Sequence, residues 1–206
     1  MRNTIIIYIL FTIFALVGIA SASETILLTD TNVALPPGFV VTLITDTSSS
    51  PNTMSIQLTG VPSGYNPNDF KMIKEVFYNL DPNIYKVTKV TINGNDVTSQ
   101  WTLNQDGKNV ASFGTFNALS DPKTGNHAGW GIIYPIIFEF NQIAPLGTNN
   151  DGHNAAAHIL FGDTTINAVD STWITNGIPE FPTVALPIAA VIGLVFFFQN
   201  KKKKEE

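Results

Sequence analysis

The chain has 206 residues, a formal net charge of −5 and a charged fraction of only 13%. It contains no cysteine, which excludes disulfide bonds, thiolate metal sites and a cysteine nucleophile. Residues 24–178 carry thirteen Asp and Glu against six Lys, a net charge of −7, and such an acidic region is poorly suited to bind nucleic acid.

The first 22 residues have the three parts of a secretory signal peptide. Arg2 supplies a positive start, residues 5–19 form an almost uninterrupted apolar stretch, and Ala20, Ser21 and Ala22 are small residues that signal peptidase accepts. We therefore expect cleavage after Ala22 and export of the protein. The alternative is an uncleaved N-terminal membrane anchor.

Residues 23–178 are expected to form one β-rich domain. Short runs of β-branched and aromatic residues are separated by Pro, Gly, Asn and Asp, and turns recur roughly every 8 to 12 residues. No stretch looks like the helical crossover that a parallel sheet requires. The predicted fold class is mainly β, an antiparallel β-sandwich of jelly-roll type, flanked by an N-terminal signal helix and a C-terminal transmembrane helix.

The first half of this domain contains several predicted strands. Residues 25–29 and 39–45 are β-prone runs, and Met54, Ile56 and Leu58 alternate with polar residues as in a half-buried strand. Residues 68–72 predict a short helical turn, with a strand from about Lys74 onward.

The second half is punctuated by turn signals. Asn93-Gly94 lies between the β-prone runs 86–92 and 98–103, which predicts a hairpin, and residues 104–107 predict a second turn before a strand at 110–116. Residues 121–131 are expected to form a loop. Residues 132–140 predict a strand in which Pro135 indicates an edge position or a bulge. Residues 155–161 and 172–175 complete about ten predicted strands.

The last 28 residues have a tripartite order. Pro179, Glu180, Phe181 and Pro182 precede an uncharged apolar run, residues 183–198, and the basic tail 199–206 begins with Gln199-Asn200 and four lysines. As a helix the apolar run would rise about 24 Å, slightly less than the roughly 30 Å of bilayer hydrocarbon. The lysines predict a cytoplasmic tail, and therefore an extracellular domain.

This arrangement resembles the PEF-CTERM sorting signal of archaeal surface proteins, which is related to bacterial PEP-CTERM signals. The resemblance implies that an archaeosortase-like transpeptidase recognises Pro179, Glu180, Phe181 and Pro182, removes the tail and transfers the new C-terminus to a lipid, much as in GPI anchoring. A plain C-terminal membrane anchor is the alternative.

Three short stretches of the globular region also resemble exosortase-associated secreted proteins that have no assigned activity. These stretches are residues 77–82, 155–159 and 171–174. The resemblance implies a β-rich surface domain.

A metal site is considered for the loop 149–154. Asn149, Asp151 and His153 offer ligands around a glycine, as in some calcium sites, but the spacing fits no EF-hand and such a loop is also a common turn. A zinc site would need His127, His153 and His158 to converge. For His158, which lies in an apolar run, a hydrogen-bonded core histidine is the alternative.

A glycan-binding site is considered at two aromatic residues. Trp130, between two glycines, is a candidate for an exposed platform, and Tyr65 lies in a loop rich in Pro, Gly and Asn. The alternative is that Trp130 closes one end of the sandwich. Trp101 and Trp173 are expected in the core.

No catalytic residue is identified. Asp81, Glu139, Asp151 and Asp163 are carboxylates of the kind that glycosidases pair, but any acidic domain contains such residues. There is no G-x-S-x-G motif.

The sequence therefore predicts a non-enzymatic, membrane-anchored protein of the cell surface that serves in the envelope, adhesion or matrix, with no cofactor. The alternative is a carbohydrate- or calcium-binding module on the same anchor. The expected partners are signal peptidase, the transpeptidase, the membrane and, for the binding module, surface glycans.

Overall fold

Two antiparallel sheets of six strands each form the domain. The computed structural model describes residues 23–123, 125, 127–162 and 169–177. In spatial order, the strands of the first sheet are β1 (Ser23–Leu28), β3 (Val40–Asp46), β4 (Asn52–Gly60), β10 (Ile136–Phe140), β6 (Val87–Ile92) and β7 (Asn95–Asp96). Those of the second sheet are β2 (Asp30–Thr31), β12 (Ser171–Thr175), β11 (Ala155–Phe161), β5 (Phe70–Tyr78), β9 (Ala118–Pro122) and β8 (Trp101–Asp106).

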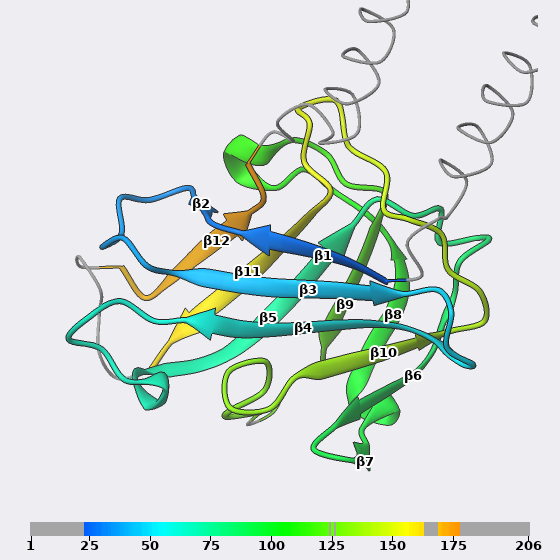
Figure 1. Ribbon diagram of the computed structural model, residues 1–206, viewed down its shortest axis with the longest axis horizontal. Coiled ribbons are helices and arrows are strands. Elements are labelled where there is room, and N and C mark those ends of the chain that lie inside the picture. Colours follow the sequence, from blue (N-terminus) through cyan, green and yellow to red (C-terminus); the bar gives the residue numbers. More distant parts are fainter. Residues whose placement is uncertain (1–22, 124, 126, 163–168, 178–206) are drawn as a thin grey trace, which may run out of the picture.

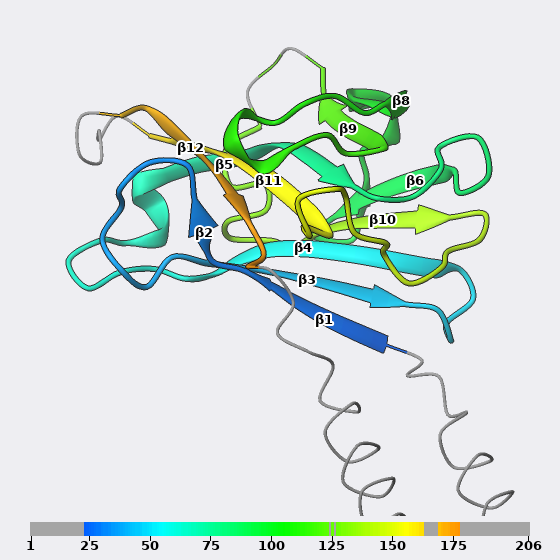
Figure 2. The same ribbon diagram turned by 90° about the horizontal axis from the view of Figure 1, so that it is seen from above.

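The two sheets lie face to face. Figures 1 and 2 show β1, β3 and β4 in one layer and β12, β11 and β5 in the other. Three 3-10 turns interrupt the connections: η1 (Pro67–Asp69), η2 (Thr98–Gln100) and η3 (Ala111–Phe113). The mainly β, two-sheet antiparallel architecture is confirmed, and the jelly-roll connectivity stays a prediction.

Alternating side chains build the core between the sheets. In β4, Met54, Ile56 and Leu58 are buried while the residues between them are half-buried, as the period of two predicts. The central strand β10 adds Ile136 and Phe138, which are fully buried. This core holds the two sheets together because it removes apolar area from water on both inner faces.

A second, smaller apolar cluster lies on the outer face of the second sheet. The segment 107–117 covers it, and Trp173 packs at its border. Its members are Phe77, Val110, Phe113, Phe116, Leu119 and Ala156.

Several local predictions were wrong in instructive ways. Pro135 lies just before β10, where it removes no ladder hydrogen bond, and β10 is central rather than at an edge. The Asn93-Gly94 turn is confirmed, with φ of 50° and 74°, but its second strand is only β7, and the chain then crosses to the other sheet as β8.

The predicted turn at residues 104–107 is largely strand. Asn104 has a φ of 55° inside β8, and its side chain bonds the backbone of Val87 in the opposite sheet. The predicted strand at 110–116 is the turn η3, and β9 occupies the start of the predicted loop 121–131. The predicted helical turn is η1, and β5 begins at Phe70, earlier than expected.

The predicted signal helix and transmembrane helix lie outside the described residues. Within the described ranges, no helix is long and apolar enough to span a membrane.

Candidate functional site

The C-terminal end of the described chain is fixed by Asn176, which is only 6% exposed. Its Oδ1 accepts hydrogen bonds from the backbone N–H groups of Asn154 (2.8 Å) and Ala155 (3.3 Å). Its carbonyl oxygen accepts a 2.7 Å hydrogen bond from Nδ1 of His153. The chain is therefore held in the sandwich up to Gly177, immediately before the predicted sorting segment.

The loop 149–154, considered for a metal, is organised by hydrogen bonds within the protein. Oδ1 of Asn149 accepts hydrogen bonds from the backbone N–H groups of Asp151 (3.0 Å) and His153 (2.9 Å), and its Nδ2 donates to the carbonyl of Phe113 (2.7 Å). The Asn149 oxygen that would bind calcium therefore organises a turn. Over the described residues, no three His, Asp or Glu side chains are grouped to hold a metal ion.

The three histidines have separate partners. His153 is buried beside Asn176 and Phe113. The ring centroids of His153 and Phe113 lie 5.5 Å apart. His127 is also buried, and its Nε2 lies 2.9 Å from the carbonyl oxygen of Lys123. His158 is half-buried on the outer face of β11. The convergence that a zinc site needs is not present among these residues.

Trp130 is half-buried in an aromatic stack. The His127 imidazole lies 4.0 Å from it with planes 21° apart, and the Trp101 ring lies parallel at 5.9 Å. His127 therefore covers one face of the Trp130 ring, and the ring packs on the core, as the alternative of a ring that closes the sandwich supposed. Glycan binding at Trp130 stays a prediction. Tyr65 is half-buried and packs near Phe39, with ring centroids 6.5 Å apart.

A row of polar and aromatic side chains crosses the outer face of the second sheet. His158 of β11 lies opposite Glu75 of β5 and Trp173 of β12. Its Nδ1 donates a 2.8 Å hydrogen bond to Oε2 of Glu75, and its ring stacks on Trp173 at 4.3 Å. The His158 hydrogen bond holds the pKa of the Glu75 carboxyl below its usual value, against the opposing effect of burial.

This row was not predicted from the sequence. Glu75, His158 and Trp173 are far apart in the chain, and only the strand register brings them together. His158 is hydrogen-bonded, as the core alternative supposed, but it lies on the outer face. Trp173 is half-buried there, whereas the expected core position of Trp101 is confirmed at 3% exposure.

Of the candidate carboxylates, Asp81, Glu139 and Asp151 lie in the described part of the chain, each in a different segment. Glu139 is paired with Lys89 at 2.8 Å, and Oδ1 of Asp81 accepts the backbone N–H of Asn83. Asp151 is exposed in the loop 149–154, and Asp163 lies outside the described residues.

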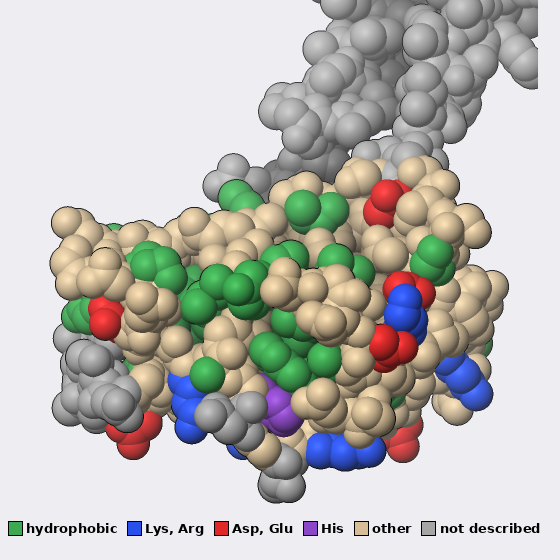
Figure 3. Space-filling model, turned by 90° about the horizontal axis from the view of Figure 1, so that it is seen from below, with side chains coloured by type: hydrophobic (Ala, Val, Ile, Leu, Met, Phe, Trp, Pro, Cys, Tyr) green, Lys and Arg blue, Asp and Glu red, His purple; other side chains and the backbone are tan. Residues whose placement is uncertain are grey.

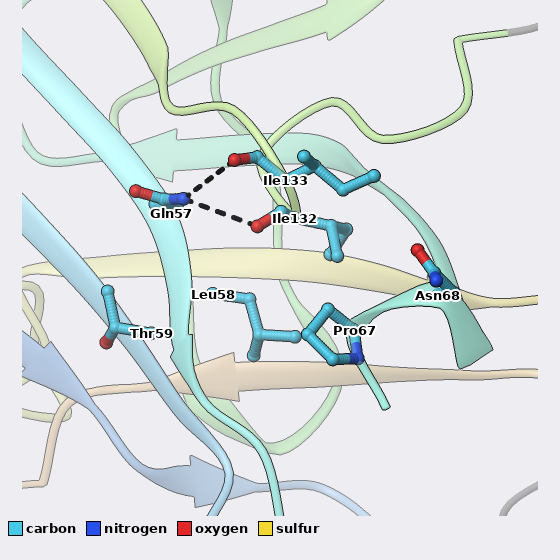
Figure 4. A pocket seen from close by; sticks show the side chains of 7 residues that line it. All are labelled: Gln57, Leu58, Thr59, Pro67, Asn68, Ile132 and Ile133. Carbon is cyan, nitrogen blue, oxygen red and sulfur yellow. Dashed lines mark hydrogen bonds between the residues drawn. The ribbon is translucent and has the colours of Figure 1, made fainter. Parts of the chain in front are cut away.

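A shallow cleft of about 560 Å³ lies at one end of the first sheet. Figure 4 shows Nε2 of Gln57 pointing to the carbonyl oxygens of Ile132 and Ile133, both at 3.3 Å. None of the described residues that line the cleft has an ionisable side chain. Its lining residues are Gln57, Leu58, Thr59, Pro67, Asn68, Ile132 and Ile133.

The comparison with protein families identifies the C-terminal segment. Residues 178–202 match the family model of the PEF-CTERM archaeal protein sorting domain. No curated protein and no solved structure matches the chain. The resemblance of the globular region to exosortase-associated proteins therefore stays a prediction. The motif Pro179, Glu180, Phe181 and Pro182 lies outside the described residues but inside the matched range. The chain carries a C-terminal PEF-CTERM archaeal protein sorting domain.

Proposed function

We propose that the protein is exported and displayed at the cell surface, where its β-sandwich is a non-enzymatic component of the envelope, of adhesion or of a matrix. The observation that carries this proposal is the sorting-domain match at residues 178–202. A signal of this family directs a protein to a membrane-associated processing enzyme, and the N-terminal apolar segment fits export.

The proposed pathway has two processing steps. Signal peptidase cleaves after Ala22, and an archaeosortase-like transpeptidase then recognises Pro179, Glu180, Phe181 and Pro182. The transpeptidase removes residues 183–206 and joins the new C-terminus to a lipid. Lys201 to Lys204 keep the tail on the cytoplasmic side until cleavage, which leaves the domain outside.

The geometry near the sorting segment supports this pathway. The sandwich holds the chain up to Gly177, and the matched range begins one residue later. Only residues 178–182 separate Gly177 from the apolar run 183–198 in the sequence, so the proposed cleavage would leave the domain a few residues from its lipid.

Several side chains weighed as catalytic, metal-binding or glycan-binding groups have partners within the described part of the protein. Asn149 organises a turn, Glu139 pairs with Lys89, and Trp130 is stacked on His127. The proposal of a non-enzymatic role without a cofactor draws on these partners.

Replacement of the acidic motif residue tests the proposal. In the native host, the Glu180→Ala variant should accumulate as a longer form that retains residues 183–206, because the processing enzyme no longer recognises the motif. Glu205→Ala, an acidic residue beyond the matched range, is the control and should be processed like the wild type. Normal processing of Glu180→Ala would contradict the proposed pathway.

A further inference from the structure

Strand β5 contains two β-bulges near its start. Along β11, Phe161 faces Phe70 and Leu160 faces Met72, which leaves Lys71 as an extra residue. Ile159 then faces Ile73 and His158 faces Glu75, which leaves Lys74 as the second extra residue. A bulge re-aims the side chain of its extra residue, and both bulges of this strand do so with a lysine.

Neither bulge lysine is used within the sandwich. Lys71 and Lys74 are exposed, and neither ammonium group makes an ion pair or a hydrogen bond within the part of the chain that the structure describes. By contrast, Lys89 and Lys108 pair with Glu139 and Glu75.

Both lysines line one cleft of about 610 Å³ on the second sheet. Lys123 contributes a third ammonium group to the lining, and its Nζ donates a 2.9 Å hydrogen bond to the carbonyl of Ser99. Asp121, the acidic residue of the lining, accepts a hydrogen bond from Gln105. Three of the six lysines of residues 24–178 therefore surround one cleft in a region whose net charge is −7.

The cleft also has a fixed apolar part. Met72 and Leu160 form a cross-strand pair in it, and Pro122 contributes from the end of β9. Figure 3 shows one face of the domain, on which apolar side chains gather beside a histidine and lysines lie near the border. Apolar surface next to cationic groups suits a sugar ring that carries acidic substituents.

The segment 127–130, which contributes His127 to the lining of the cleft, is hydrogen-bonded to the bulged part of β5. The backbone N–H of Gly129 donates to the carbonyl of Lys71, and that of Ile73 donates to the carbonyl of Trp130, both at 2.8 Å. His127 lines the cleft and is held by its stack on Trp130. These two hydrogen bonds fix residues 129–130 against β5, and fixed groups lower the entropic cost of binding.

We propose that this cleft binds a carboxylated or sulfated glycan, with Lys71 and Lys74 contacting its acidic groups. The volume lies in the range of small-molecule sites and exceeds what a single inorganic anion requires. Outside the cleft the domain is acidic, which disfavours a long, densely charged nucleic acid. The proposal does not depend on the anchoring pathway.

The cleft lies near the start of β12, whereas the described chain ends just after the other end of that strand. Leu160 faces Ser171 at the start of β12, whereas the chain leaves the sandwich after Thr175 at the other end of that strand. Four residue steps of β-strand separate these positions by about 13 Å. The cleft would therefore remain accessible on an anchored domain.

The test is a titration of the full chain, purified in detergent, with polygalacturonate, dextran sulfate and neutral dextran. At low salt we expect binding of at least one acidic polymer and none of neutral dextran. The Lys71→Gln/Lys74→Gln variant should bind about tenfold more weakly. The matched control, Lys86→Gln/Lys89→Gln, removes the same charge elsewhere and should stay within about twofold of the wild type. Thermal unfolding checks that both variants are folded.

Other outcomes overturn the proposal. An equal loss of affinity for the acidic polymers in the two double variants would show that binding depends on net charge alone. Binding of neutral dextran, or no binding of any polymer, would remove the acidic glycan as ligand. Complete competition by inorganic phosphate at concentrations similar to those of the sugar units would reduce the site to a small-anion site. If the protein bound single-stranded DNA more tightly than the acidic glycans, the ligand of the cleft would be a nucleic acid and not a glycan.

Discussion

His153 and Asn176 are joined by a 2.7 Å hydrogen bond from the imidazole Nδ1 to the backbone carbonyl, and both residues are buried. The bond ties the loop before β11 to the last residues of the sandwich, two positions before the matched sorting range. Because a carbonyl oxygen can only accept, Nδ1 is the donor of this bond. The exit of the chain toward its anchor is thus part of the folded core.

Loss of the Asn176 side chain should destabilise this exit. Asn176→Ala leaves the backbone N–H groups of Asn154 and Ala155 without their acceptor, and we expect a loss of about 1–3 kcal/mol in the free energy of unfolding. Chemical denaturation of the purified protein measures it. Asn68→Ala, at an exposed position in η1, should change the stability by less than about 0.5 kcal/mol. Equal effects of the two substitutions would contradict the role given to Asn176.

The Glu75–His158 pair should make stability depend on acid pH. The pKa of Glu75 is lower in the folded protein than its usual 4.5, so its contribution is present above that value and is lost as the pH falls through the folded pKa. The wild type should therefore be more stable than Glu75→Gln near about pH 6, and the difference should shrink toward about pH 3. Asp106→Asn, at an exposed carboxyl, controls for removal of a negative charge. A difference between wild type and Glu75→Gln that does not change with pH would refute this assignment.

The loop 149–154 should behave as a turn and not as a calcium site. Asn149→Ala breaks three hydrogen bonds and should cost about 1–3 kcal/mol, whereas Asp151→Ala removes an exposed carboxylate and should cost much less. Added calcium should leave the Tm of the wild type unchanged. A calcium-dependent rise in Tm that both substitutions abolish would restore the metal interpretation.

Asn104 should be a stability determinant because it connects the two sheets. Its side chain pairs with the backbone N–H (2.6 Å) and carbonyl (2.9 Å) of Val87, while its φ of 55° suits Asn or Gly. Asn104→Gly loses the bonds but keeps the backbone conformation, and should cost about 1–3 kcal/mol. Asn104→Ala should cost about 1 kcal/mol more, because alanine is strained in this region. Identical unfolding free energies for the two variants would argue against backbone strain at this position.

Local sequence patterns predicted much of the fold. The alternation at Met54, Ile56 and Leu58 gave the correct inner face of β4, and Asn93-Gly94 marked a real hairpin. These features depend on side-chain periodicity and on backbone preferences within a few residues, so a sequence reveals them.

What the sequence did not reveal depends on contacts between distant segments. The run at 132–140 was correctly read as apolar, but whether Pro135 lies in the ladder depends on where β4 and β6 begin to pair with β10. The bulges that expose Lys71 and Lys74 exist only relative to β11. The stack of His127 on Trp130 likewise forms only in the folded structure. From the sequence alone, the two glycines beside Trp130 indicated an exposed ring.

The most direct test of the proposed processing is the intact mass of the protein extracted from its native membrane. We expect a chain that lacks residues 1–22 and 183–206, ends within residues 179–182 and carries an addition of lipid size. A mass that includes residues 183–206 would contradict processing at the sorting signal.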